Sequence, residues 1–385
     1  MPPLRIKRYA KGAFQSGISN GLKKAGKGFF LLLKYGIMSP YAEKKTMAGA
    51  EPGGKERSMI LQKKPGQDFV LLNLSDPQVS TENLREKNKH YTTMCGTIHE
   101  LIKQVQPDLI TVSGDLTYGG SYEVYEFYAD FMDSLNIPWA FVWGNHDNQA
   151  GKEATRRAEA IFENHPLCLF EKGDEQYGSG NYILEVWEGG RPVEAIFMMD
   201  THDREPYGDQ SAWGKLQPEQ IEWYRARVAE LKAKGFPESM LITHIPIYAY
   251  RDAYKAAFRN PLDPGERLPV GRSYGKTVWN EGYEDSFGVN WENICSYEAE
   301  DGMMDALVEM NHTKHVLAGH DHINNSSICY RGVRLTYALK TGTGCYANWR
   351  LNGGTVYRIG ENGVCDLYHE YIDPHFYMPA EEIQP

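Results

Sequence analysis

The amino-acid sequence predicts an α/β fold across residues 68–372, with strands and helices alternating along the chain. Short apolar runs rich in branched and aromatic side chains predict strands, and helical stripes separate several of them. Such alternation is typical of a sheet that places ligand-binding loops at the carboxyl ends of its strands. The five runs that end in polar clusters are residues 69–74, 109–112, 139–142, 240–242 and 315–317.

Helices are predicted where apolar residues recur at steps of three and four. One such stripe spans residues 98–105, and another spans residues 221–231. The C-terminal part predicts two antiparallel hairpins instead, because its branched runs flank turn residues. Their paired arms are residues 327–330 with 333–337, and residues 355–359 with 364–371.

Two segments of different composition precede this region. Residues 1–38 form a basic arm with apolar residues at helical spacing, which predicts an amphipathic helix. Residues 39–67 are rich in small, charged and helix-breaking residues, which predicts a linker. Residues 373–385 are expected to be a short polar tail.

The formal net charge of −10 combines two parts of opposite sign. Residues 1–50 contain ten Lys or Arg and one acidic residue, which leaves 31 basic and 50 acidic residues in the remainder. An acidic body repels phosphate backbones, so we expect no binding to the nucleic-acid backbone. A basic helix with a Phe and Leu face is typical of an interfacial anchor, so residues 1–36 are expected to meet an anionic membrane surface. The alternative is an arm that packs loosely on the body, because the five glycines between residues 12 and 28 weaken the helix.

Neither a disulfide framework nor a membrane span is predicted. The six cysteines lie far apart with no CxxC or CxxH spacing, which favours reduced thiols. No apolar stretch reaches the roughly 18–20 residues that span a bilayer. We therefore expect a cytoplasmic protein, peripheral on the membrane if the arm binds lipid.

Polar clusters with Asp, Asn or His follow all five predicted strands. Folding does not require these side chains, and burying them unpaired costs free energy, whereas a metal ion supplies the missing partner. Imidazoles and carboxylates without thiolates suit iron, zinc, manganese, cobalt or nickel. So many donors exceed the needs of one ion and suit two ions that share a carboxylate. The clusters are residues 75–78, 114–118, 144–147, 243–244 and 319–322.

In this order, the clusters resemble the motifs of the calcineurin-like metallophosphoesterases, over about residues 68–371. Residues 137–147 and 316–322 are most similar to the purple-acid-phosphatase-like branch. The resemblance implies a four-layer α/β-β-α sandwich that hydrolyses phosphate esters with two metal ions. These would be Fe, Mn or Zn, and Fe(III) with a divalent ion is one such pair.

The resemblance also implies a role for each matching residue. Asp115 would bridge the two metal ions, and His146, oriented by Asp147, would face the substrate phosphate without binding metal. The other ligands would be Asp76 and His322 for the first metal, and Asn145, His244 and His320 for the second.

The first cluster departs from the family pattern, because Gln78 stands where most members have a histidine ligand. Tyr118, three residues after Asp115, matches the position at which purple acid phosphatases give iron(III) a phenolate. Tyr118 is therefore expected either to bind the first metal or to be a loop aromatic. Gln78 would be a weak ligand of the first metal or a substrate contact.

The expected reaction is hydrolysis of a phosphate ester, favouring phosphomonoesters, by a metal-bridging hydroxide that attacks phosphorus in line. His146 would neutralise the developing charge and could protonate the leaving alkoxide. Two alternatives stay open. One is a phosphodiesterase acting on nucleotide or lipid-linked substrates, and the other is a catalytically dead binding module, which only Gln78 supports. Residues 250–291 are expected to form a long aromatic-rich loop that covers the site or forms a satellite core.

Overall fold

The structure is a computed structural model that describes residues 59–258 and 279–373. The predicted basic arm over residues 1–38 lies outside the described residues, as do most of the linker and residues 374–385 of the tail. The expected membrane contact of residues 1–36 therefore stays a prediction.

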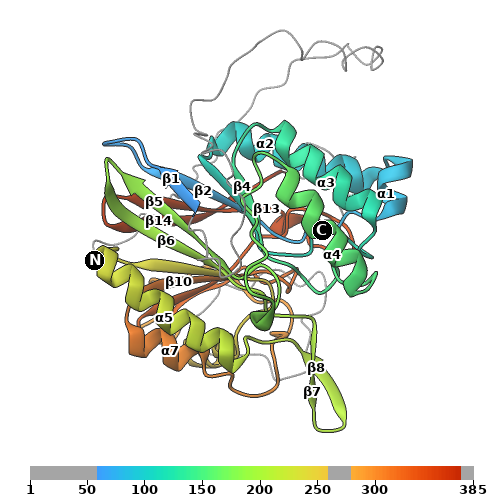
Figure 1. The fold of residues 1–385 in the computed structure, drawn as a ribbon. Helices are drawn as coiled ribbons and strands as arrows, with labels where there is room; N and C mark the ends of the chain where they lie inside the picture. The colour runs from blue at the N-terminus through green and yellow to red at the C-terminus, as the bar shows by residue number, and fades with distance from the viewer. Residues whose placement is uncertain (1–58, 259–278, 374–385) are drawn as a thin grey trace, which may run out of the picture. The chain divides into compact units, whose positions relative to one another are not determined.

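Two β-sheets lie face to face and carry helices on their outer faces (Figure 1). The five-stranded sheet has the order β14-β13-β2-β3-β4 and is covered by α1 to α4, whereas the seven-stranded sheet has the order β1-β5-β6-β9-β10-β12-β11 and carries α5 and α7. The predicted four-layer α/β-β-α sandwich is confirmed. All six residues of β2 and all five of β9 are buried, as expected for strands covered on both faces.

The bounds of the predicted strands agree with the apolar runs to within two residues, whereas α2 begins nine residues before its predicted stripe. The five-stranded sheet consists of β2 (Phe69–Leu74), β3 (Leu109–Val112), β4 (Trp139–Phe141), β13 (Gly353–Gly360) and β14 (Gly363–Tyr371). The other sheet consists of β1 (Met59–Gln62), β5 (Tyr182–Glu188), β6 (Arg191–Met198), β9 (Ser239–Thr243), β10 (Thr313–Ala318), β11 (Ser327–Tyr330) and β12 (Val333–Tyr337). The helices are α1 (Thr81–Glu86), α2 (Lys89–Val105), α3 (Tyr122–Ser134), α4 (Lys152–Asn164), α5 (Pro218–Lys234), α6 (Ala249–Ala257) and α7 (Met303–Met310). A separate hairpin of β7 (Arg204–Tyr207) and β8 (Gln210–Trp213) projects from the body (Figure 1).

The predicted linker is wrong at its C-terminal end. Residues 59–62 form the edge strand β1, which pairs in parallel with β5 from Met59 opposite Leu184 to Gln62 opposite Trp187. Leu61 is buried while Ile60 is 58% exposed, so the strand contributes only one side to the core. A strand of four residues among helix breakers has too short an apolar pattern to be recognised without its partner.

The expected long loop over residues 250–291 begins instead with helix α6. Tyr250 and Tyr254 of this helix are buried in the core beneath the seven-stranded sheet, and the Tyr250 hydroxyl donates hydrogen bonds to the backbone oxygens of Val316 and Thr336. For these aromatics the satellite-core interpretation is confirmed. Residues 259–278 lie outside the described part.

Among the helices of residues 59–258 and 279–373, none has the length and hydrophobicity that a membrane span requires.

The parallel strands bring the polar clusters to one edge of the molecule. In one sheet Leu74 pairs with Val112 and Val112 with Phe141, so the loops after β2, β3 and β4 leave the sheet side by side. In the other sheet Ala318 pairs with Thr243, so the loops after β9 and β10 are neighbours too. The fold therefore gathers the carboxyl ends of five strands at one site.

Candidate metal centre

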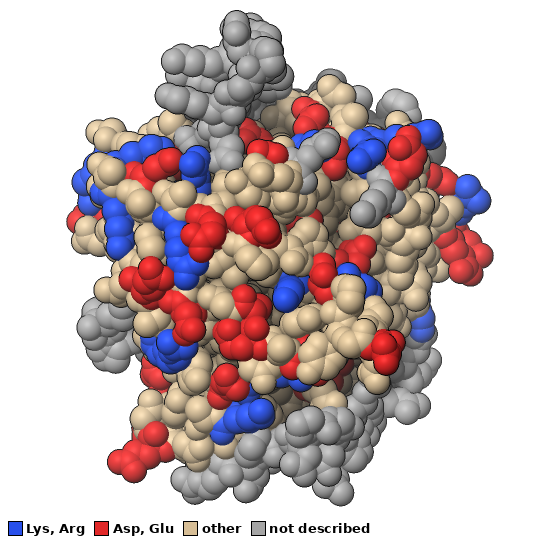
Figure 2. Space-filling model, turned by 60° about the horizontal axis from the view of Figure 1, so that its bottom comes forward, with Lys and Arg blue, Asp and Glu red and all other residues tan. Residues whose placement is uncertain are grey.

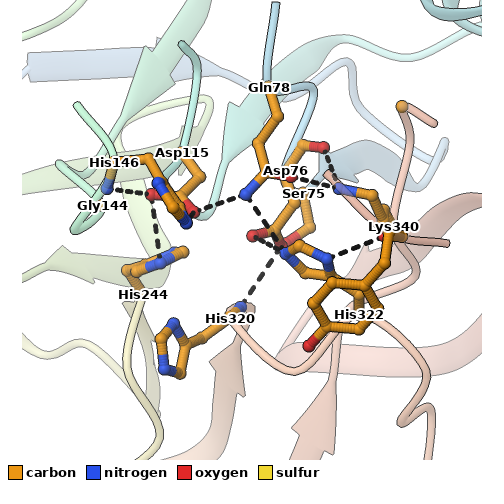
Figure 3. Close-up of polar contacts among 12 residues, drawn as sticks. Ser75, Asp76, Gln78, Asp115, Gly144, His146, His244, His320, His322 and Lys340 are labelled. Carbon is orange, nitrogen blue, oxygen red and sulfur yellow. Dashed lines mark hydrogen bonds and ion pairs between the residues drawn. The ribbon is translucent and has the colours of Figure 1, made fainter. Parts of the chain in front are cut away.

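Two buried carboxylates lie at the centre of the site (Figure 3). Asp76 and Asp115 are 2% and 0% exposed, and both have left-handed backbones with φ of 50° and 54°. Residues other than glycine seldom adopt this conformation except at strained or functional positions. One ligand atom each from Asp76, Asp115 and His244 lies within 4.8 Å of the other two, a spacing that suits a metal ion.

Two glycines allow the surrounding loops to approach this closely. A Cβ atom at Gly144 would lie 2.2 Å from Oδ1 of Asp115, and one at Gly114 would lie 2.4 Å from Nδ1 of His244. No side chain could be accommodated at these distances without moving Asp115 or His244. The Gly-Asp and Gly-Asn pairs of the sequence are therefore steric requirements of the site.

His244 presents one nitrogen to the carboxylates. Its Nδ1 lies 2.8 Å from the backbone oxygen of Ser113, so Nδ1 carries the proton and donates it. The lone pair of Nε2 then faces Oδ1 of Asn145 at 3.1 Å and Oδ1 of Asp115 at 3.4 Å. A backbone carbonyl that fixes the tautomer in this way is typical of metal-binding histidines.

His322 has the same arrangement on the other side. Its Nδ1 donates to the backbone oxygen of Tyr346 at 2.9 Å, and its Nε2 lies 3.3 Å from Oδ1 of Asp76. Burial acts to raise the pKa of Asp76, but His322, His244 and Lys340 outweigh it and hold this pKa below its usual value. The ionised carboxylate is thus the form that the site stabilises.

Two buried polar atoms of the site have no hydrogen-bond partner, namely Oδ1 of Asp76 and Nε2 of His320. Unpaired buried acceptors are costly, and a metal ion would satisfy such atoms. The His320 ring lies on the His244 side of the centre, with 5.1 Å between the ring centroids, and ligand atoms of Cys295 and Asp321 are also within 4.8 Å of it. The donor set fits metal ions.

A buried lysine holds Gln78. The amide Nε2 of Gln78 donates to Oδ2 of Asp115 at 2.8 Å and lies 3.2 Å from Nε2 of His322. Its Oε1 accepts from Nζ of Lys340 at 2.7 Å, and Lys340 also donates to the backbone oxygen of Asp76 at 2.9 Å. As placed, Gln78 directs its NH₂ group toward the carboxylates, so metal ligation by Gln78 would require its amide to turn over.

His146 stands at the mouth of the site. Its backbone N–H donates to Oδ1 of Asp115 at 2.8 Å, and its Nε2 lies 4.0 Å from Oδ2 of the same carboxylate. Nδ1 accepts from Nε2 of Gln149 at 2.6 Å, so the proton of the neutral ring lies on Nε2. The ring of Tyr118 stacks on the ring of His146 with 4.6 Å between centroids. Sequence reasoning did not identify Gln149.

The structure corrects the expected role of Asp147. Its buried carboxylate accepts hydrogen bonds from the backbone N–H groups of Gly144, Leu116 and Thr117 and from the Thr117 hydroxyl. These four contacts occupy both oxygens of Asp147. Its carboxylate therefore holds the loop after β3 and the loop after β4 together. It does not orient the His146 ring, because the carboxylate of Asp147 is turned toward the backbone of the preceding loop.

Two further residues near the site were not predicted. Lys340 interrupts an apolar run, which is a usable signal, whereas Trp213 carries no motif and reaches the site only through the β7–β8 hairpin. The ring centroid of Trp213 lies 4.3 Å from that of His320. His202 lies near α5, where its Nε2 is 3.1 Å from Oε1 of Gln220.

Comparison with known proteins gives several relatives of low identity. "Probable inactive purple acid phosphatase 28" of Arabidopsis thaliana is 24% identical over 287 residues, covering 66% of this chain and 63% of that protein. "Phosphatase DCR2" of Saccharomyces cerevisiae is 26% identical over 366 residues, covering 86% of this chain and 57% of that protein. The chain thus spans about three fifths of the length of these curated relatives. Among solved structures, a dimetal phosphatase from Danio rerio is 12% identical with a TM-score of 0.48, and the match covers 79% of this chain and 98% of that one.

A family model also matches more than half of this chain. The family model described as calcineurin-like phosphoesterase matches residues 70–324, which include every predicted metal ligand from Asp76 to His322. The resemblance found in the sequence motifs is confirmed, and relatives named as probable inactive purple acid phosphatases agree with the predicted branch. This chain belongs to the calcineurin-like phosphoesterase family.

Proposed function

We propose that this chain is a phosphohydrolase that uses two metal ions and prefers phosphomonoesters. The observation that carries the proposal is the pairing of two buried carboxylates with histidines whose Nε2 lone pairs face them. One ion would be held by Asp76 and His322. The other would be held by Asn145, His244 and His320, and Asp115 would contact both ions. Metal ions held there would supply a hydroxide nucleophile at neutral pH and neutralise charge on the phosphate.

The chain's own groups complete the chemistry. The Nε2–H of His146 points into the mouth of the site, where it can donate a hydrogen bond to a phosphate oxygen and a proton to the leaving alkoxide. Gln149 fixes this tautomer by donating to Nδ1. Lys340 and Gln78 hold the backbone of Asp76 and the carboxylate of Asp115 in place.

The extent of each relative's match supports the preference for monoesters. The relative named as a phosphatase matches 86% of this chain, whereas relatives named as phosphodiesterases match 25–38% of it. Hydrolysis of a panel of mono- and diesters by the metal-loaded protein tests this preference. A greater kcat/KM for every diester would reverse the assignment.

Two substitutions test the division of roles. Asp115→Ala should remove stoichiometric metal, whereas His146→Ala should keep the metal and lower kcat by about 100-fold or more, the usual contribution of a general acid. Elemental analysis and turnover are measured on both variants. Full-length protein that binds no metal at all would favour the alternative of a dead binding module.

Tyr118 keeps its two interpretations. Its ring stacks on His146 and is 41% exposed, which supports a loop aromatic beside the substrate. If Tyr118 instead binds Fe(III), the protein should be coloured, and Tyr118→Phe should bleach it without unfolding it. A colourless protein with full Fe(III) occupancy would reject ligation by Tyr118.

A further inference from the structure

Three aromatic side chains each pack against one histidine of the site. Tyr118 stacks on His146, with 4.6 Å between centroids and 27° between planes. Tyr346 lies over His322 at 4.2 Å and 32°. Trp213 meets His320 nearly at right angles, at 4.3 Å and 78°. The three rings come from separate segments, namely the loop after β3, the loop after β12 and the end of β8.

These rings are held in place while much of their surface remains open. Tyr118 and Tyr346 are 41% and 44% exposed, and they are two of the seven large hydrophobic side chains that are exposed within the described residues. The hydroxyl of Tyr346 donates to Oε2 of Glu292 at 2.7 Å, which fixes the direction of the ring. Trp213 is half-buried, with the guanidinium carbon of Arg204 3.6 Å from its ring centroid. Such a cation–π contact restrains the indole.

Shielding of the metal ligands does not account for this arrangement. A ring that only excluded water from a histidine would be expected to bury its own surface, as Tyr250 and Tyr337 do in the core. Figure 2 shows acidic and basic side chains interspersed on the face toward which the hairpin projects, without a continuous patch of one sign. Charge at this face therefore gives a ligand no single direction of attraction, and the exposed rings are the more specific feature.

We infer that Tyr118, Trp213 and Tyr346 form an aromatic rim that binds the alcohol part of the substrate, and that this part is itself an aromatic ring. The inference rests on the proposed function and names its substrate class as aryl phosphomonoesters. The phosphate would lie at the metal centre beside His146, and the aryl ring would stack among the three side chains. Each such ring contact strengthens binding by about 2- to 12-fold.

Non-hydrolysable ligands test the rim without interference from leaving-group chemistry. Binding of phenylphosphonate, cyclohexylphosphonate and methylphosphonate to the metal-loaded full-length protein is measured by titration calorimetry. Phenylphosphonate should bind about 5- to 50-fold more tightly than methylphosphonate, and more tightly than cyclohexylphosphonate. Equal binding of the phenyl and methyl ligands, or of the phenyl and cyclohexyl ligands, overturns the inference.

Variants then assign the effect to the rim. Tyr346→Leu and Trp213→Leu should each lower the phenyl-to-methyl ratio several-fold and leave methylphosphonate affinity and metal content unchanged. Tyr207→Leu is the matched control, because Tyr207 is an exposed aromatic on the same hairpin that packs on Tyr297 instead. A parallel loss of both ligands in the rim variants would show that the rings act on the metal centre, and would also overturn the inference.

The outcomes separate this inference from the proposed function. If none of the three phosphonates binds the metal-loaded protein and no phosphate ester is hydrolysed, the proposed function fails together with the rim. If phosphate esters are hydrolysed and the phosphonates bind equally, only the rim fails.

Discussion

The close approach of Gly144 to Asp115 makes a strong steric prediction. In the Gly144→Ala variant the new Cβ would lie 2.2 Å from Oδ1 and 2.3 Å from the backbone N of Asp115. Ordinary contact begins near 3.4 Å, so the loop carrying Asn145 and His146 must move by about 1.2 Å. Because the atoms that the new Cβ would meet include the backbone N of Asp115, rotation of side chains alone cannot absorb this shift.

The expected cost follows from the hydrogen bonds that such a shift breaks. The N–H of Gly144 donates to Asp147 at 2.9 Å, and the N–H of His146 donates to Asp115 at 2.8 Å. Hydrogen bonds to charged groups contribute about 1.5–3 kcal/mol each, so losing both lowers the free energy of unfolding by about 3–6 kcal/mol. If the variant folds with the loop displaced, the side chains of the site shift by about 1 Å. A shift of that size lowers kcat by about 100-fold.

Urea unfolding, metal content and kcat of Gly144→Ala are measured against wild type. Gly96→Ala is the matched control, because Gly96 lies in α2 with no atom within 4 Å of its added Cβ. Alanine at this helical position should leave activity unchanged and stabilise by up to about 1 kcal/mol. Wild-type stability, metal content and turnover in Gly144→Ala would refute the steric argument.

Three further predictions concern other parts of the chain. Glu194 is fully buried, and burial followed by repulsion from Glu238 raises its pKa well above 4.5. The wild type should therefore lose stability as pH rises above about 4.5, by up to about 1.4 kcal/mol per unit until the folded-state pKa is reached. In urea unfolding, Glu194→Met should then have a greater free energy of unfolding than wild type at pH 8, and this difference should shrink toward pH 5. A difference that does not change with pH contradicts the prediction. Gln149→Leu should lower kcat several-fold at unchanged metal content, and an unaltered kcat would remove Gln149 from the mechanism. Full-length protein should co-sediment with anionic vesicles at low salt and detach at high salt. Protein lacking residues 1–50 should stay in solution at both salt concentrations. If full-length protein also stays in solution at low salt, the arm is no anchor.

Local patterns were enough to predict which side chains gather at the candidate site. Asp76, Asp115, Asn145, His244 and His322 each follow an apolar run closely, and the position of a residue after a strand depends on its neighbours in sequence. Parallel strands then bring such ends together whatever the remaining contacts are. For the same reason the bounds of β2, β3, β11 and β12 agree with the hydrophobic pattern.

The hairpin of β5 and β6 shows a local signal that went unused. The Gly189-Gly190 pair between two apolar, branched stretches is a typical two-residue turn. The edge strand β1 is different, because its four residues carry no recognisable period and are ordered only by pairing with β5. Strand pairing over more than a hundred residues is a tertiary property.

The sequence by itself determined which side chains could bind metal and in which order they follow the strands. Only the tertiary structure decided how those side chains are supported. Lys340 reaches Gln78 from a point 262 residues away, and it thereby directs the amide NH₂ toward the carboxylates. Trp213 and Tyr346 reach site histidines from a separate hairpin and loop. Such contacts depend on how two sheets and their loops pack, and the distance along the chain between the partners leaves no local pattern from which to predict them.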